Sequence, residues 1–136
     1  MVGIPQFWVY TMGHMEAVAE LITERDIDFL DHLTNVTCQD FEDSTGFELC
    51  FTFDININEY FMDELLIKRY YVPNLLLDDE PILKNATGCN INWKEGGRFM
   101  YRDVKKNHRS KSGRRGGQIR TVNKREWTYS FFHFFV

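Results

Sequence analysis

The stretch Gly46–Asp54, GFELCFTFD, alternates apolar and polar side chains with the period of a β-strand. One face carries Phe47, Leu49, Phe51 and Phe53, and the other carries Glu48, Cys50, Thr52 and Asp54. This is the clearest strand pattern in the chain, and it predicts that the first of the two faces lies on an apolar core.

Further strands are expected on both sides of this one. Residues 36–41, VTCQDF, form a weaker strand, and the turn residues at 42–46 predict a hairpin between the two. Residues 64–72, ELLIKRYYV, predict a third strand that Pro73 ends. Residues 89–93, CNINW, place alternate apolar side chains on one side.

Short amphipathic helices are expected before the strands. Apolar residues recur at helical spacing within 4–11, 15–22 and 27–33, and acidic residues occupy the opposite side. Asp26 is placed to cap the third of these helices. At the other end, the phenylalanines of residues 131–135 follow helical spacing, with Ser130 as N-cap. Helices followed by meandering strands indicate an α+β fold with an antiparallel sheet.

A basic ribbon is expected in the last third of the chain. Residues 98–104 and 118–122 suit its two arms, with the Ser/Gly/Arg tract 110–117 at its tip. Residues 1–93 contain four Lys and Arg against seventeen Asp and Glu, whereas residues 94–136 contain twelve against three. This uneven charge favours two surfaces with different partners.

Composition and motifs exclude several classes of protein. The length of 136 residues, with 43% hydrophobic residues, suits one small packed domain. No apolar run is long enough to span a membrane, and three scattered cysteines argue against a disulfide framework. No catalytic or metal-binding arrangement of residues appears, so we expect neither an enzyme nor a cofactor.

The basic block allows two interpretations. Ten Lys and Arg lie between Arg102 and Arg125 against one acid, Asp103, which suits contact with nucleic-acid phosphates. However, no Phe, Tyr or Trp that could stack on a base lies between Tyr101 and Trp127. Short basic clusters also serve as nuclear localisation signals that an import receptor reads. Composition alone leaves both interpretations open.

Six blocks in order carry a family resemblance: GIPQFW (3–8), FELCFTFD (47–54), NEYFMDELLIKRYY (58–71), TGCNINWKEGG (87–97), IRTV (119–122) and SFFHFF (130–135). Together they closely resemble the nucleosome assembly protein family of histone chaperones. The resemblance implies short amphipathic helices packed on a four-stranded antiparallel sheet, with a protruding basic β-hairpin. It also implies a non-enzymatic protein of nucleus and cytoplasm that binds core histones through acidic surface and promotes nucleosome assembly.

The resemblance also implies partners and site residues. The hairpin that an import receptor would read holds Lys105, Lys106, Arg109, Lys111, Arg114 and Arg115. Candidate histone-binding residues, chosen because they cluster in the acidic segment, are Glu20, Glu24, Asp28, Asp31, Glu59, Asp63, Asp78, Asp79 and Glu80. Binding to DNA is expected to be weak or absent. The alternatives are a nucleic-acid-binding module that acts through the hairpin and a scaffold or phosphatase-inhibitor relative of the family.

The chain departs from the family pattern at both ends. Family members are homodimers that pair through a long helix before the GIPQFW block, and they continue after SFFHFF into further helices and an acidic tail. Residues 1–136 are therefore expected to be a partial family domain without these parts, and not to form the helix-paired dimer.

Overall fold

The computed structural model describes residues 3–77, 79–95, 100–109, 117 and 119–136. Three short helices come first: α1 (Phe7–Gly13), α2 (Glu16–Ala19) and α3 (Glu24–Leu30). Four strands follow: β1 (Leu33–Asp40), β2 (Gly46–Phe53), β3 (Leu65–Tyr71) and β4 (Asn85–Thr87). A two-stranded ribbon of β5 (Tyr101–Arg109) and β6 (Ile119–Trp127) leads to a 3-10 helix, η1 (Phe131–Phe135). No helix among these residues is long and apolar enough to cross a membrane.

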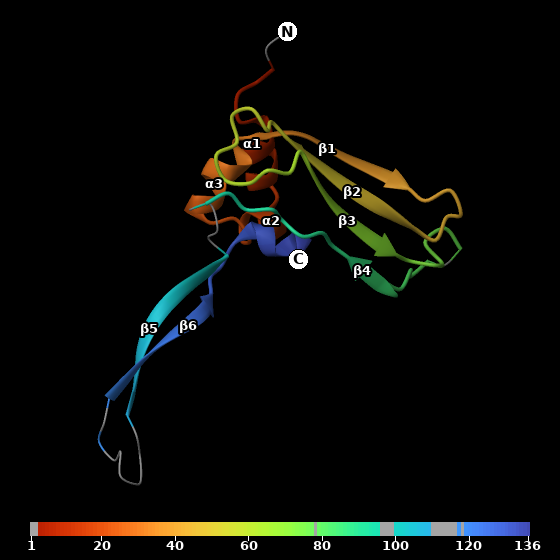
Figure 1. Ribbon diagram of the computed structural model, residues 1–136. Coiled ribbons are helices and arrows are strands. Elements are labelled where there is room, and N and C mark those ends of the chain that lie inside the picture. The colour runs from red at the N-terminus through yellow and green to blue at the C-terminus, as the bar shows by residue number, and fades with distance from the viewer. Residues whose placement is uncertain (1–2, 78, 96–99, 110–116, 118) are drawn as a thin grey trace.

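The four strands form one antiparallel sheet in the order β1-β2-β3-β4, which confirms the α+β prediction. The helices gather at one end of this sheet (Figure 1). We call the opposite end, which carries residues 41–46, 72–77 and 79–84, the turn end. The pairing of β1 with β2 places Thr37 opposite Cys50 and Cys38 opposite Leu49, so Cys38 and Cys50 lie on different faces.

The apolar face of β2 lies on the core, as its alternation predicts. Phe51 and Phe53 are buried, and Leu49 packs against the buried cluster. The Phe53 ring meets the edge of Phe61 with ring centroids 4.9 Å apart. Phe132 of η1 is fully buried in the same cluster. Aromatic rings from β2, the β2–β3 loop and η1 therefore make up much of the core.

The start of α3 differs from the prediction that Asp26 caps it. Thr23 is the N-cap, and Asp26 occupies the third helical position of a capping box. The Asp26 carboxylate accepts hydrogen bonds from the Thr23 backbone N–H and hydroxyl, both at 2.8 Å. Asp26 is also fully buried, whereas Ile27 is 38% exposed, so the helix turns Asp26, Phe29 and Leu30 inward.

The same carboxylate holds the end of the chain. The Ser130 hydroxyl donates to Asp26 at 2.6 Å, and the Phe131 backbone N–H donates at 2.9 Å. Ser130 also accepts from the Phe132 N–H, which confirms it as the predicted N-cap. Asp26 therefore joins the first turns of α3 and η1, two segments more than a hundred residues apart.

The ribbon extends away from this body (Figure 1). Its strands pair without interruption from Tyr101 opposite Trp127 to Arg109 opposite Ile119. Residues 101–104 and 119–122 of the two predicted arms lie in these strands, which continue to Arg109 and Trp127, whereas Met100 precedes β5. Residues 98–99 and 118 of the predicted arms lie outside the described residues. The tip predicted at 110–117 lies outside the described residues except for Gly117, so the complete hairpin stays a prediction.

Candidate functional site

The outer face of α3 gathers three of the predicted acidic residues. Glu24, Asp28 and Asp31 are separated by four and three residues, so they share one side of the helix, and all three are exposed. Glu20 follows α2 as its C-cap and is also exposed. This grouping leaves Asp26 out, because its carboxylate is buried between α3 and η1.

The β2–β3 loop adds a fifth acid, Glu59, next to a residue that packs on α3. Tyr60 packs on Phe29 of α3, with ring centroids 3.7 Å apart, and Glu59 is its exposed neighbour. Asp63, in contrast, accepts hydrogen bonds from the Asn92 backbone N–H at 2.7 Å and from the Asn92 side chain at 2.8 Å. We define the α3 surface as Glu20, Glu24, Asp28, Asp31 and Glu59; Asp63 is tied to the loop that follows β4.

The remaining candidates lie elsewhere. Asp79 and Glu80 are exposed in the β3–β4 connection, at the turn end of the sheet. The register of β2 with β3 places this end, Gly46 opposite Tyr71, a whole strand length from the helix end, Thr52 opposite Leu65. Asp78 lies outside the described residues. The nine predicted residues therefore do not form one patch.

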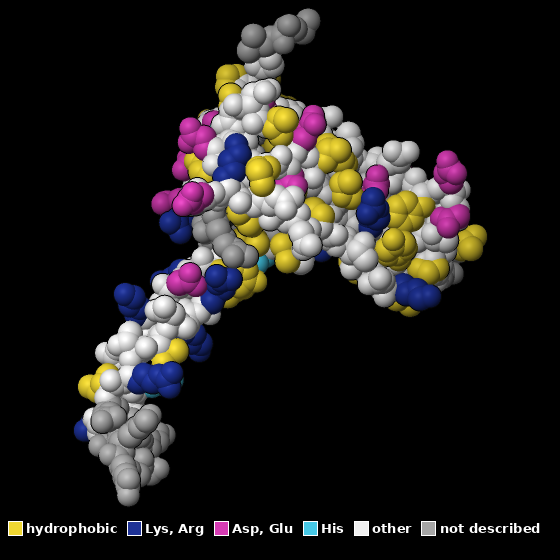
Figure 2. Space-filling model, viewed as in Figure 1, with side chains coloured by type: hydrophobic (Ala, Val, Ile, Leu, Met, Phe, Trp, Pro, Cys, Tyr) yellow, Lys and Arg dark blue, Asp and Glu magenta, His cyan; other side chains and the backbone are white. Residues whose placement is uncertain are grey.

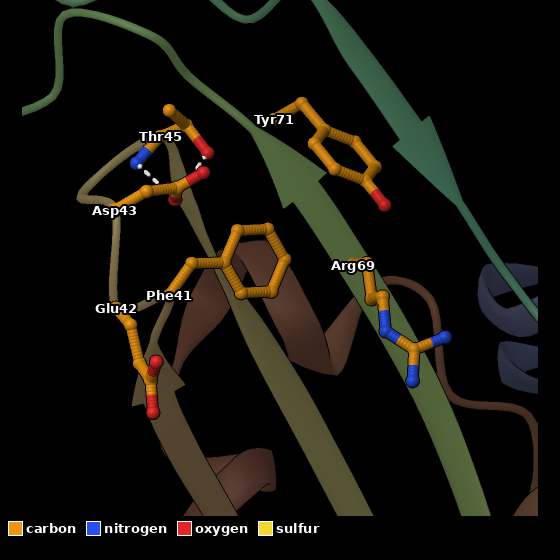
Figure 3. Close-up of a pocket in the computed structure, with 6 residues that line it drawn as sticks. All are labelled: Phe41, Glu42, Asp43, Thr45, Arg69 and Tyr71. Carbon is orange, nitrogen blue, oxygen red and sulfur yellow. Dashed lines mark hydrogen bonds between the residues drawn. The ribbon is translucent and has the colours of Figure 1, made fainter.

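The turn end holds acidic residues that the sequence prediction missed. Glu42 and Asp43 line an open hollow of about 430 Å³ together with the rings of Phe41 and Tyr71 and with Arg69 (Figure 3). Thr45 donates to the Asp43 carboxylate through its hydroxyl at 2.6 Å and its backbone N–H at 3.1 Å. These hydrogen bonds lower the pKa of Asp43, and the bond from the Thr45 hydroxyl has the larger effect. The turn residues were assigned only a structural role, although their charge was visible in the sequence.

Charge is distributed along the chain in a way that matches these surfaces. Residues 26–67, which include most of α3 and all of β1 and β2, contain eleven Asp and Glu and no Lys or Arg. Acidic side chains lie around the helical part of the body, and basic side chains follow the ribbon (Figure 2). This part of the body therefore carries an excess of negative charge, and the exposed Arg25 is the one Lys or Arg of α3.

The ribbon places the predicted import residues in different environments. Lys105 and Arg109 are exposed on one face, since they are four residues apart on β5. Lys106 points to the other face, where its ammonium contacts Glu126 at 2.6 Å. Lys111, Arg114 and Arg115 lie outside the described residues.

Ion pairs fix the base of the ribbon. Glu126 also contacts Arg102 at 3.1 Å, and Asp103 contacts Arg125 at 3.2 Å across the two strands. Hydrogen bonds from Lys106 and then Arg102 lower the pKa of Glu126. Among the described residues no group of His, Cys, Asp and Glu is arranged to hold a metal ion. The exposed acids of the α3 surface and the exposed cations of the ribbon are suited to binding partners of opposite charge.

Comparisons with known proteins agree with this arrangement. The family model described as "Nucleosome assembly protein (NAP)" matches residues 1–136. A protein named nucleosome assembly protein from Saccharomyces cerevisiae is 33% identical over 98% of this chain and 32% of its own length. Nucleosome assembly protein 1;3 from Nicotiana tabacum is 37% identical over 98% of this chain and 33% of its own. The chain thus spans about one third of the length of these relatives.

Solved structures have the same fold. Nucleosome assembly protein 1 from Plasmodium knowlesi superposes with a TM-score of 0.70 at 23% identity, over 97% of this chain and 50% of that one. The crystal structure of a malaria parasite nucleosome assembly protein gives a TM-score of 0.64 at 21% identity, over 98% and 48%.

Proposed function

Because this chain belongs to the nucleosome assembly protein family, we propose that it is a histone-binding part of a histone chaperone that promotes nucleosome assembly. The α3 surface and its surroundings would bind core histones by charge, without an enzymatic step. One observation carries the proposal: residues 26–67 hold eleven acids and no Lys or Arg, and the exposed Asp28 and Asp31 of the α3 surface belong to this segment.

The physical basis is competition with DNA. Histones are strongly cationic, and polycations bind DNA by releasing counterions from its phosphates. A chaperone needs an anionic surface that competes with phosphate and still releases its cargo. Exposed carboxylates provide attraction over about 10 Å at 0.1 M salt, because screening limits their range. The α3 surface has this character, since its acids are exposed and none of them is ion-paired among the described residues.

Charge reversal at the end of α3 tests the proposal. In the double variant Asp28→Lys and Asp31→Lys, histone affinity should fall about tenfold. Lysines at a helix C-terminus interact favourably with the helix dipole, so the fold should survive. The matched control is Asp79→Lys with Glu80→Lys, which changes the net charge equally at the turn end. Affinity is measured by fluorescence titration with purified core histones at physiological salt.

Three results would decide the matter. A larger loss for the α3 double variant than for the control supports the α3 surface. An equal loss in both would show that net charge, and not this surface, drives the binding. If the unaltered chain binds DNA but no histone, the chaperone proposal is wrong and the nucleic-acid alternative takes its place.

We propose a separate role for the ribbon. Lys105 and Arg109 are exposed on the same face of β5 and have no acidic partner among the described residues, so an import receptor could bind them. Lys106 and Arg102 are instead held by Glu126. On this proposal the protein enters the nucleus through its ribbon and binds histones through its body, and DNA contact by the ribbon is weak.

A further inference from the structure

β1 is an edge strand of the four-stranded sheet, and among the described residues no other strand lies along its outer side. Most of its eight residues are exposed, and its one charged residue, Asp40, stands at its end. Proteins usually protect such an edge with lysine, proline or a covering element, because its unpaired backbone groups attract other strands. β1 has a register shift between Leu33 and Asn35 but none of these other protections along the rest of its length.

The backbone groups that point outward can be identified from the ladder. The Phe41 N–H donates to the Gly46 carbonyl at 2.9 Å, so residues of odd number in β1 bond to β2. The N–H and C=O groups of Val36, Cys38 and Asp40 then point away from the sheet. Among the described residues none of these groups has a backbone or side-chain partner. The Trp8 indole donates to the Thr34 carbonyl at 3.1 Å, so the open edge starts after that residue.

The side chains of Val36, Cys38 and Asp40 lie on one face of the sheet, and an apolar groove lies on that same face. Val36 is opposite Phe51 and Cys38 is opposite Leu49, so these pairs share a face. The groove has a volume of about 500 Å³ and is lined by Val36, Leu49 and Phe51 with α1, α2 and η1. Its rim includes Met15 and Leu21, which are 57% and 55% exposed. A strand added beside β1 would turn every second side chain toward this groove.

Charge indicates which kind of strand fits. Asp31 precedes β1, Asp40 ends it, and Glu42 and Asp43 follow it, while the nearest Lys or Arg in the sequence are Arg25 and Lys68. A basic segment would therefore be attracted to both ends of the edge. A second copy of β1 suits it less: antiparallel pairing centred on Thr37, which sets the outward-pointing Val36 opposite Cys38, would set Asp31 opposite Asp43 at both ends. Like charges directly opposite each other destabilise a strand pair.

We propose that β1 binds an extended basic segment of the partner as a fifth strand of the sheet. Its backbone would pair with Val36, Cys38 and Asp40, and its alternate apolar side chains would enter the groove. This inference rests on the proposed function for its partner, since a histone would supply the basic segment. It adds a backbone-pairing mode to charge attraction at the α3 surface.

The test uses the whole chain and a synthetic probe, a peptide of about ten residues in which lysine alternates with valine. Amide hydrogen exchange is followed by NMR. The amides of Val36, Cys38 and Asp40 should exchange freely without the peptide and be protected with it. Amides of Asn35, Thr37 and Gln39, which already bond to β2, should change little. A peptide N-methylated at alternate residues on the side facing β1 should not protect them, because it cannot complete the ladder.

A proline variant distinguishes backbone pairing at the β1 edge from attraction by the net charge of the chain. Cys38→Pro removes an outward N–H without breaking a bond to β2. The affinity of this variant for the probe peptide should fall about tenfold. The matched control is Ala86→Pro on β4, the opposite edge of the same sheet, where the same alternation also points the N–H outward. The control should bind the probe as the unaltered chain does.

Failure of this inference differs from failure of the proposed function. If the probe binds without protecting the three amides, or if Cys38→Pro binds it normally, edge pairing is wrong. Core histones could still bind to the α3 surface in that case. If the three amides become protected as protein concentration rises without peptide, the occupant is a second copy and the basic partner is overturned. Protection by the peptide that Cys38→Pro removes and Ala86→Pro keeps would support the proposal.

Discussion

The body and the ribbon are held together by different forces. In the body, Phe53, Phe61, Phe132 and Phe135 have no more than 1% of their surface exposed. In the ribbon, no described residue of β5 or β6 is buried. The acids of the body stand outside a packed core, whereas several charges of the ribbon pair across its two strands. Changing a surface charge should therefore leave the body folded. In the ribbon, the ion-paired charges stabilise the pairing of the two strands, whereas the others are available to bind a partner.

The largest expected effect comes from opening the core. Phe132→Ala removes a fully buried ring that packs against Phe61, with centroids 5.7 Å apart. The free energy of unfolding should fall by about 4 kcal/mol, because a cavity remains where the ring was. Urea denaturation followed by tryptophan fluorescence measures it. The control on the ribbon is Ile119→Ala, where the side chain is 68% exposed and the loss should stay below about 0.5 kcal/mol. Similar losses in both variants would contradict the contrast between the two regions.

Asp26 should give the next largest effect, because its carboxylate serves two chain segments. Asp26→Ala leaves the N–H groups of Thr23 and Phe131 without their acceptor in a buried place. We expect a loss of about 3 kcal/mol. Asp28→Ala, an exposed aspartate on the same helix, is the control and should change stability by less than about 0.5 kcal/mol. Equal stability of both variants would show that the link between α3 and η1 does not hold the fold.

Much of the fold could be predicted because the body follows simple periodic rules. The alternation of Gly46–Asp54 gave the core face of β2, and the stop at Pro73 agrees with the end of β3 at Tyr71. The role of Asp26 could not be predicted, since its second set of partners, at Ser130 and Phe131, is distant in sequence. A local capping rule uses only the position of an aspartate near a helix start, so it does not predict that the side chain is buried.

The candidate site was less predictable than the fold. Acidic residues were selected by their position in the sequence, and the structure brings Glu24, Asp28 and Asp31 together on α3. It places Asp79 and Glu80 at the turn end, because the strands separate residues that follow one another in the chain. On the ribbon, neighbouring Lys105 and Lys106 point to opposite faces. Charge counts give the sign of a surface, whereas the register of the strands decides which charges share it.

The exposed cations of the ribbon should affect localisation more than stability. Lys105→Ala with Arg109→Ala should lower the nuclear fraction of a fluorescent fusion protein and cost less than about 0.5 kcal/mol, since both side chains are exposed. The matched control, Arg120→Ala with Lys124→Ala, removes the same charge from the opposite face of the ribbon. Equal loss of import in both would point to total charge. Unchanged import together with lost DNA retention would favour the nucleic-acid alternative.

The smallest effect concerns pH and the base of the ribbon. Hydrogen bonds from Lys106 and Arg102 lower the pKa of Glu126 below its ordinary value of 4.5. A carboxylate whose pKa is lowered by folding stabilises the folded state above its ordinary pKa, and this stabilisation is lost as pH falls through the folded value. The amides of β5 and β6 near Glu126 should therefore lose protection from hydrogen exchange as pH falls below 4.5, before the core of the body does. In the Glu126→Gln variant, these amides should already be less protected than in the unaltered chain at neutral pH, and their protection should change little on acidification. High salt should weaken the same contacts in the unaltered chain, because they lie at the surface. If protection in the ribbon is the same at pH 7 and pH 3, the strand ladder alone holds it, and the distinction between structural and free charges on the ribbon is wrong.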